Sequence, residues 1–263
     1  LPARKCVAVD CDNTLWGGIV GEDGVAGLLL GDEFPGSAFV DFQRLLLHWK
    51  RQGLMLAIIS KNNEQDVWQI FESHDAMQLK KSDFVAWRIN WEPKPANLAQ
   101  IAQELNIGID SFIFLDDNPF EIQQMKQMLP GVLSIQIPEE PARIVSTLKR
   151  HHLFDVLDIS EDDRRKTEMM NAERARKPLQ ESMSPEEFIR SLNLTVEVFR
   201  PKEEHVGRVT QLINKTNQFN LTTIRRTQDE VRSLMQNSAF RLYGAKITDR
   251  FGDYGITGLV IFK

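Results

Sequence analysis

Two aspartates separated by one residue, Asp10 and Asp12, follow the apolar run 7–9. Such a run is typical of a buried parallel strand, and in open α/β sheets the chemistry gathers beyond the carboxyl ends of these strands. Two carboxylates held close together repel each other, and burial makes the repulsion worse. A divalent cation relieves it, and Mg²⁺ prefers oxygen ligands while keeping water and phosphate in its shell. The pair therefore indicates a metal-assisted phosphate site or, in the alternative, two solvated aspartates that cap a helix.

Three further strand ends carry polar side chains that could serve the same site. Ser60 follows an apolar segment, and Asp116 and Asp117 follow another. Lys94 stands at the entrance of a helix that Pro95 can begin. Taken alone, a lysine is by default a surface residue. An acidic pair, a serine, a lysine and a second acidic pair, in that order at the ends of separate strands, are a much stronger indication of one site.

The elements that position these residues follow a regular pattern. Apolar segments alternate with amphipathic helical segments up to about residue 137, which predicts a doubly wound parallel sheet with right-handed crossovers. We expect this catalytic domain to cover residues 1–150. Ser37 is predicted to be the N-cap of a helix that ends at Gly53. The glycine-rich segment at about 16–36 is predicted to be a mobile hairpin, either a flap that excludes water from the aspartate pair or simply a surface loop.

The composition excludes several classes of protein. The 263 residues are 42% hydrophobic and 26% charged, which is ordinary for a soluble globular protein. A net charge of −5 argues against a nucleic-acid binder. No apolar run approaches the roughly 20 residues that span a bilayer, and no signal peptide is evident. Cys6 and Cys11 lie on one predicted strand with side chains on opposite faces, so we expect free thiols and a cytoplasmic protein.

The second half of the chain follows a different pattern. Residues 151–263 are expected to form a smaller α+β region. A helix is predicted to begin at Ser184, a strand is expected at 194–198, and an antiparallel pair at about 240–243 and 256–260. The chain has no initiator Met and ends within a predicted strand, so we expect a domain cut from a longer protein.

Two segments of this half could contact a partner. A helix is predicted to begin near Ser160, and basic residues on it could dock an acidic carrier, the alternative being a solvated helix face. These residues are Arg164, Arg165, Lys166, Arg174, Arg176 and Lys177. The segment 215–222 is rich in side-chain donors and acceptors, which could bind substrate or carrier or could tie a loop together.

The strand ends resemble the motifs of a known superfamily. The segment 10–14 resembles the first motif of the haloacid dehalogenase superfamily of phosphatases and phosphotransferases. Ser60 resembles the second motif, which implies a hydrogen bond to the phosphate. Lys94 resembles the third, which implies that it neutralises charge on the transferring group. Asp116 and Asp117 resemble the fourth. The resemblance implies an α/β Rossmannoid fold of three layers.

The resemblance also implies how the acidic residues act. Asp10 would be the nucleophile that forms an aspartyl-phosphate, and Asp12 would be the general acid and base. Mg²⁺ would be held by Asp10, by the backbone carbonyl of Asp12 and by Asp116, whereas Asp117 would act through water. Phosphoryl transfer is mostly positioning and charge stabilisation, which suits this set of side chains.

The resemblance narrows to the FkbH-like family of polyketide biosynthesis. The segments that carry it are 12–18, 90–94, 114–119, 215–222 and 249–255. It implies an enzyme that takes 1,3-bisphosphoglycerate, removes phosphate and delivers a three-carbon acyl unit to the phosphopantetheine thiol of an acyl carrier protein. It also implies that residues 151–263 begin an acetyltransferase-like domain that continues beyond Lys263.

Cys11 has two interpretations. Cysteine is often a buried packing residue, and the position between two catalytic carboxylates needs only an apolar side chain. In the FkbH-like family an active-site thiol holds the glyceryl unit as a thioester, which implies that role for Cys11. Flanking carboxylates disfavour the thiolate, and a metal ion offsets that effect.

Three functions are consistent with these residues. The first is a Mg²⁺-dependent phosphatase and acyltransferase that loads glyceryl, or a related three-carbon acid, onto a carrier protein. The second is a plain phosphatase of small metabolites or phosphoproteins, with Cys11 as core packing. The third is a docking module of a synthase with no catalysis of its own, against which the complete set of motif residues argues.

Overall fold

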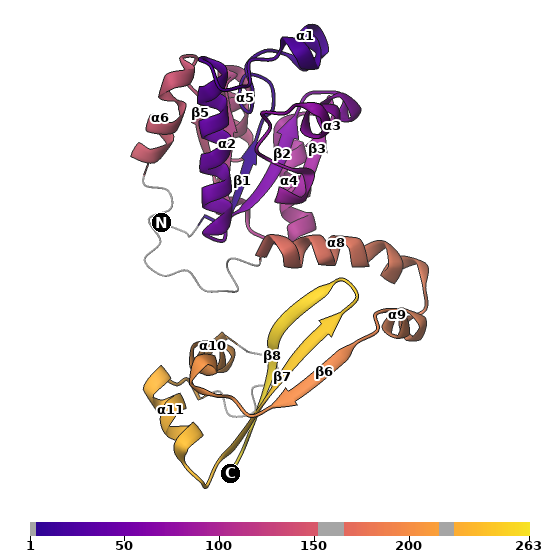
Figure 1. Ribbon diagram of the computed structural model, residues 1–263, viewed down its shortest axis with the longest axis vertical. Helices are drawn as coiled ribbons and strands as arrows, with labels where there is room; N and C mark the ends of the chain where they lie inside the picture. The colour runs from indigo at the N-terminus through magenta and orange to yellow at the C-terminus, as the bar shows by residue number, and fades with distance from the viewer. Residues whose placement is uncertain (1–3, 152–165, 216–223) are drawn as a thin grey trace. The chain divides into compact units, whose positions relative to one another are not determined.

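The computed structural model describes residues 4–151, 166–215 and 224–263 of the chain. The chain divides into two compact units, Leu1–Asn171 and Ala172–Lys263, which Figure 1 shows as ribbons. Each unit is considered separately below.

The first unit is built on a five-stranded parallel sheet. Its strands are β1 (Cys6–Val9), β2 (Met55–Ser60), β3 (Phe84–Ile89), β4 (Phe112–Asp116) and β5 (Leu133–Gln136). They lie in the order β3-β2-β1-β4-β5, and all the pairings are parallel. Every residue of β1, β2 and β4 is buried, as expected for a sheet with both faces covered. The predicted α/β fold with a parallel sheet is confirmed.

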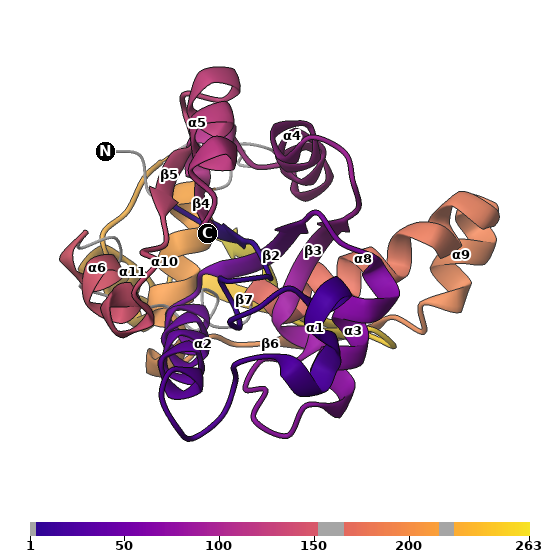
Figure 2. The same ribbon diagram turned by 90° about the horizontal axis from the view of Figure 1, so that it is seen from above.

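Helices cover both faces of this sheet (Figure 2). One face carries α2 (Gly36–Arg51), α3 (Glu64–Ser73) and α6 (Ile144–Arg150), and the other carries α4 (Lys94–Leu105) and α5 (Pro119–Met128). Phe42, Ile70 and Leu148 belong to the apolar cluster on the first face. Leu98, Ile101 and Met125 belong to the cluster on the second. Short 3₁₀ helices occur at Lys81–Asp83, Ile109–Ser111 and Pro141–Arg143.

The two cysteines lie on opposite faces of the sheet. Cys11 belongs to the first apolar cluster and Cys6 to the second. Both thiols are free and buried. The predicted absence of a disulfide between them is confirmed.

The segment after β1 differs from the prediction of a hairpin flap. It contains the short helix α1 (Val20–Gly27), in which Gly24 interrupts the helical backbone with a φ of 62°. The two ends of the segment are paired as in a hairpin. The Gly17 amide donates to the Leu29 carbonyl at 3.1 Å, and the Leu29 amide donates to the Gly17 carbonyl at 2.8 Å. The glycines in this segment disfavour a helix, which is why none was predicted. The two hydrogen bonds between Gly17 and Leu29 close the segment into a loop, and α1 forms within that loop.

The predicted start of α2 was also wrong, by two residues. The helix begins at Gly36, with Pro35 rather than Ser37 at the N-cap position. A Cβ at Gly36 would lie 2.7 Å from the Gly31 backbone nitrogen, so the chain can enter the helix there only because this residue has no side chain. The predicted end is confirmed: the helix stops at Arg51, and Gly53 has a φ of 87°.

The second unit contains a three-stranded antiparallel sheet. Its strands β6 (Thr195–Phe199), β7 (Arg241–Asp249) and β8 (Gly252–Phe262) lie in that order. Its helices are α8 (Lys166–Ser182, which crosses the boundary between the units), α9 (Pro185–Ser191), α10 (Val206–Lys215) and α11 (Gln228–Gln236), with a 3₁₀ helix at Glu203–His205. Val206, Val209 and Val231 form a small apolar core. The predicted start of a helix at Ser184 is confirmed, since Ser184 accepts a hydrogen bond from the Glu187 amide.

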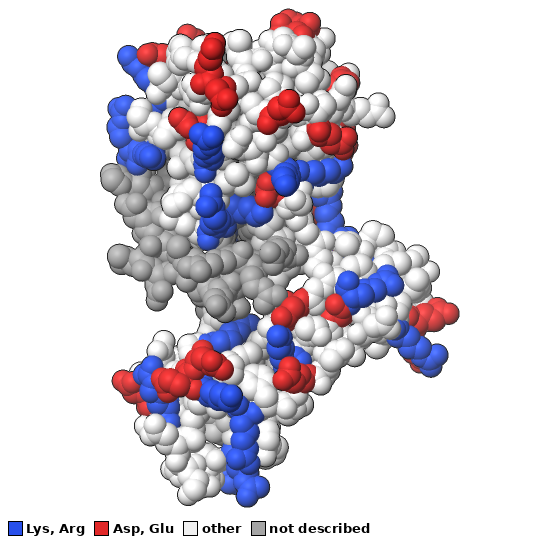
Figure 3. Space-filling view, viewed as in Figure 1, with Lys and Arg blue, Asp and Glu red and all other residues white. Residues whose placement is uncertain are grey.

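Charged side chains of both signs are interspersed over the face of the molecule drawn in Figure 3. Among the described helices, none has the length and apolar character needed to cross a membrane. The helix expected near Ser160, with Arg164 and Arg165, and most of the segment 215–222 lie outside the described residues.

Candidate active site

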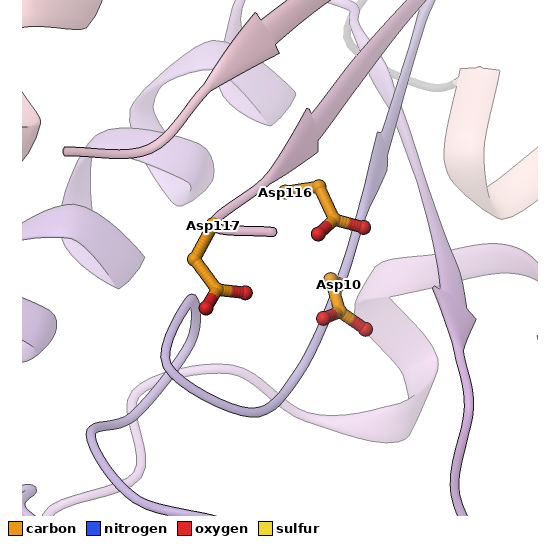
Figure 4. A group of neighbouring side chains, drawn as sticks. All are labelled: Asp10, Asp116 and Asp117. Atoms are coloured by element: carbon orange, nitrogen blue, oxygen red, sulfur yellow. The ribbon is translucent and has the colours of Figure 1, made fainter. Parts of the chain in front are cut away.

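Three carboxylates meet where β1 and β4 end. Asp10 directly follows β1, Asp116 is the last residue of β4, and Asp117 comes next in the chain. One oxygen from each lies within 4.8 Å of the others, and Figure 4 shows the three side chains converging from the two strand ends. Asp10 and Asp116 are buried. The two strands are neighbours in the sheet, so their carboxyl ends bring together residues that are far apart in the sequence.

Lys94 lies against this cluster. Its Nζ is 2.6 Å from Asp116 Oδ2 and 3.0 Å from Asp10 Oδ1, and only 3% of the residue is exposed. Lys94 is the first residue of α4, after Pro93 and before Pro95, so the helix entrance carries it over the ends of the strands. Burial alone lowers the pKa of the Lys94 ammonium, but the charges of Asp10 and Asp116 outweigh burial and raise it. The sequence-based alternative of a surface lysine is wrong.

Asp116 and Asp117 bind protons more tightly than ordinary carboxylates do. Burial and the charge of Asp10 raise the pKa of Asp116 to about 7, although Lys94 opposes the shift. The same two causes raise the pKa of Asp117 to about 6. Three carboxylates and one ammonium leave an excess of negative charge, and the donors are all hard oxygens. This donor set fits Mg²⁺, with Asp10, Asp116 and Asp117 as the side chains able to hold it.

The structure groups Asp117 with Asp10 and Asp116, and the role through water that the resemblance implies for Asp117 stays a prediction. The ligand role expected for the Asp12 backbone carbonyl stays a prediction.

The carboxylate of Asp12 accepts three hydrogen bonds from groups outside this cluster. Trp16 Nε1 donates to Oδ1 at 2.9 Å, the Val20 amide donates to Oδ1 at 3.2 Å, and Asn62 Nδ2 donates to Oδ2 at 3.0 Å. Burial raises the pKa of Asp12, and these hydrogen bonds only partly offset it. A carboxyl group with a raised pKa is suited to donate a proton.

Ser60 ends β2 and is 1% exposed. Its Oγ accepts a hydrogen bond from Asn62 Nδ2 at 3.2 Å, and its side chain also hydrogen-bonds the Cys11 thiol. The hydroxyl therefore lies at the same edge of the sheet as the acids, next to the strand that carries Asp10.

Cys11 is completely buried within the apolar cluster that contains Leu15. Burial, and next the charge of Asp10, raises the pKa of its thiol well above the usual value, although the hydrogen bond from Ser60 opposes the shift. This environment favours the packing interpretation in the conformation seen here, since the thiolate is the reactive form.

Sequence reasoning missed Asn62 as a residue of the site. It is 6% exposed and bridges Ser60 Oγ and Asp12 Oδ2. The only signal was its place in a polar segment directly after the strand that ends at Ser60. A contact between the segments after β1 and β2 is non-local, and spacing along the chain does not reveal it.

Comparisons with known proteins show a similarity to a solved phosphatase domain. No protein-family model matches the chain, and no curated protein matches it. Among solved structures, the N-terminal part of a Bacteroides fragilis protein, containing a phosphatase domain and complexed with Mg, is 39% identical with a TM-score of 0.58. The match covers 59% of this chain and 42% of that one, so the present chain spans about two fifths of that structure.

Two more distant similarities are to other solved structures. A HAD family enzyme from Bacteroides thetaiotaomicron, in complex with magnesium and inorganic phosphate, is 11% identical over 52% of this chain and 95% of its own, with a TM-score of 0.37. A haloacid dehalogenase-like family hydrolase from Xanthomonas campestris is 12% identical over 58% of this chain and 92% of its own, also with a TM-score of 0.37.

Proposed function

We propose that the first unit, which has a haloacid dehalogenase-like Rossmannoid fold, is a Mg²⁺-dependent phosphatase that forms an aspartyl-phosphate on Asp10. The observation that carries this proposal is the meeting of Asp10, Asp116 and Asp117 within 4.8 Å, with Lys94 bonded to two of them. The similarity to the Bacteroides fragilis phosphatase domain, which binds Mg, supports it.

Each side chain has a defined task in this reaction. A carboxylate oxygen of Asp10 bonds to phosphorus while the ester P–O bond breaks, and Asp12 gives its proton to the leaving oxygen. Water then attacks the phosphorus of the aspartyl-phosphate and gives a proton to Asp12, which releases phosphate and restores Asp10. The bound Mg²⁺ would neutralise negative charge on the phosphoryl oxygens.

Lys94 and Ser60 hold the transferring group. The Lys94 ammonium, fixed by Asp10 and Asp116, is placed to stabilise the charge that develops on phosphoryl oxygens. The Ser60 hydroxyl is placed to donate a hydrogen bond to one of these oxygens. Both side chains are buried, so they need little reorganisation when substrate arrives.

The test is Asp10→Asn, which keeps the size of the side chain and removes the nucleophile. Mg²⁺-dependent phosphate release from p-nitrophenyl phosphate is expected to fall by at least about a thousandfold. Asp75→Asn, on an exposed aspartate of the same unit, is the matched control and should turn over at the wild-type rate. Unchanged turnover in Asp10→Asn would contradict the assignment.

A second candidate function is the loading of a glyceryl-type unit from 1,3-bisphosphoglycerate onto an acyl carrier protein in polyketide biosynthesis. The observation that favours it is the thiol of Cys11, which stands between Asp10 and Asp12 in the chain and hydrogen-bonds Ser60. In this proposal the Cys11 sulfur bonds to the acyl carbon of the acyl phosphate, and inorganic phosphate leaves with the thiol proton. The phosphopantetheine thiol then accepts the three-carbon acyl group and returns a proton to Cys11. The phosphate ester at the third carbon is hydrolysed by Asp10 and Asp12 in the reaction described above, which leaves the glyceryl unit. Because the thiol is fully buried, the plain phosphatase is the better supported of the two.

Intact-mass analysis separates the two functions. The wild-type chain is incubated with 1,3-bisphosphoglycerate, with and without a carrier protein, and protein-bound acyl adducts are measured. Glyceryl loading requires an adduct on the wild-type chain that Cys11→Ala lacks, while Cys11→Ala still releases phosphate from p-nitrophenyl phosphate. An adduct that persists in Cys11→Ala excludes Cys11 as the acyl carrier.

A docking module without catalysis is the least supported function. Docking uses exposed side chains, whereas Lys94 and the carboxylates that it contacts are buried. A cytoplasmic location is proposed from the two free cysteines.

A further inference from the structure

We infer that Asn62 and Trp16 are positioning residues that orient the Asp12 carboxyl group toward the leaving oxygen of the substrate. The inference rests on the proposed phosphatase function. It adds which side chains orient Asp12, the general acid. Neither side chain touches the acidic cluster in the described contacts, so both would act through Asp12.

The pattern of donors distinguishes the two oxygens of Asp12. Oδ1 accepts two hydrogen bonds, from Trp16 Nε1 at 2.9 Å and from the Val20 amide at 3.2 Å. Oδ2 accepts one, from Asn62 Nδ2 at 3.0 Å. A carboxyl oxygen has two lone pairs, so Oδ1 is fully used and Oδ2 retains one position. Oδ2 is therefore the oxygen with a position free to face the leaving group of the substrate.

Asn62 connects Asp12 Oδ2 to the Ser60 hydroxyl, which would bind the phosphate. Its Nδ2 carries two N–H groups, and Nδ2 contacts both Asp12 Oδ2 and Ser60 Oγ, at 3.0 and 3.2 Å. One amide thereby sets the spacing between the hydroxyl that would hold the phosphoryl group and the acid that would protonate the leaving oxygen.

Burial fixes both supporting side chains. Asn62 is 6% exposed and Trp16 is 0% exposed, and the Trp16 ring packs edge-on against Phe71 at a centroid distance of 6.1 Å. Side chains held in this way have few alternative rotamers. The Asp12 carboxyl group is thus clamped from both sides before any substrate binds.

The consequence for the reaction depends on the leaving group. When the Asp10 oxygen bonds to phosphorus and the ester bond breaks, an alkoxide leaving group needs the proton from Asp12 Oδ2, whereas a p-nitrophenolate leaves readily without one. A misaimed carboxyl group therefore slows the first reaction much more than the second. The ratio of kcat/KM for ethyl phosphate to kcat/KM for p-nitrophenyl phosphate therefore reports how well the Asp12 carboxyl group is oriented. It does so because kcat/KM covers only the steps up to the departure of the leaving group.

The experiment measures this ratio in the presence of Mg²⁺ for the wild type and for Asn62→Ala. We expect the ratio to fall by at least about tenfold in the variant, a part of the roughly hundredfold or more that general-acid catalysis contributes. The adjacent Asn63→Ala is the matched control, since the Asn63 side chain is exposed and bonds Asp66 instead. It should keep the wild-type ratio.

A purely structural role for Asn62 would lower both kcat/KM values equally, and an unchanged ratio in folded Asn62→Ala would overturn the inference. If Asn62→Ala does not fold, Trp16→Phe removes the donor to Oδ1 and is judged by the same ratio. If the wild type releases phosphate from neither ester, the proposed function itself fails and this inference fails with it.

Discussion

Lys94 Nζ lies 2.6 Å from Asp116 Oδ2, and both side chains are almost completely buried. Asp10 Oδ1 completes the contact at 3.0 Å. A charge buried in this way depends on its partners, because taking an ion out of water without compensation is costly. The same contact therefore bears on stability and on catalysis.

Replacing this lysine by Lys94→Met should harm both properties. Two buried carboxylates lose their compensating charge, so the free energy of unfolding in urea is expected to fall by about 3–5 kcal/mol. Phosphate release should fall by at least about a hundredfold, since charge on the transferring group is no longer neutralised. Arg44→Met is the control: Arg44 pairs with Asp41 in an exposed contact at 3.2 Å, which contributes at most about 0.5 kcal/mol. Wild-type turnover in Lys94→Met would exclude the role assigned to the ammonium.

Magnesium affinity should depend on pH near neutrality. In the metal-free protein the pKa of Asp116 is about 7 and that of Asp117 is about 6, so protons compete with the metal for these oxygens as the pH falls. We expect the Kd for Mg²⁺ from calorimetric titration to rise by at least about tenfold between roughly pH 8 and pH 5.5. An affinity that stays constant over this range would show that the two carboxylates are not ligands.

Gln43 is expected to be important for stability although it lies in the interior of a helix. It is completely buried, its Nε2 donates to the Leu15 carbonyl at 2.9 Å, and its Oε1 accepts from the Gln78 amide at 2.9 Å. Gln43→Leu leaves these backbone groups without partners, so we expect a loss of about 2–4 kcal/mol in urea unfolding. Gln69→Leu, on the exposed side of α3, should change stability by less than about 0.5 kcal/mol. Equal effects in the two variants would contradict this account.

Both cysteines should resist alkylation in the native protein. Cys6 and Cys11 are 0% exposed, and burial raises the pKa of each thiol, so little thiolate exists and little of it is accessible. With iodoacetamide at about pH 8 we expect no modification by mass spectrometry in native conditions and labelling of both thiols in denaturant. Rapid native labelling of Cys11 would show that the site opens, and would favour the glyceryl-loading function over packing.

Much of this fold follows from local pattern. The strands are continuous apolar runs because both faces of the sheet are covered, and polar residues begin where each strand reaches the edge of the sheet. Asp10, Ser60 and Asp116 could therefore be placed at one edge from the sequence alone. The helix boundaries were less accurate, as at Ser37, because Gly36 enters α2 through a close approach to the Gly31 backbone that no local pattern indicates.

The parts of the site that could not be predicted depend on contacts between distant segments. The burial of Lys94 results from two carboxylates on other strands, whereas a single lysine in a sequence is ordinarily a surface residue. Asn62 reaches Asp12 across two neighbouring strand ends. The helix α1 forms although it contains Gly21, Gly24 and Gly27, which disfavour a helix.

The pairing of Gly17 with Leu29 closes the base of the segment that carries α1. Residues 18–28 begin and end at this pair of hydrogen bonds. The entropic cost of closing a loop grows only slowly with the length of the loop. Inserts of other lengths can therefore be grafted between Val20 and Leu28 while Asp10 and α2 keep their places and the Val20 amide keeps its bond to Asp12.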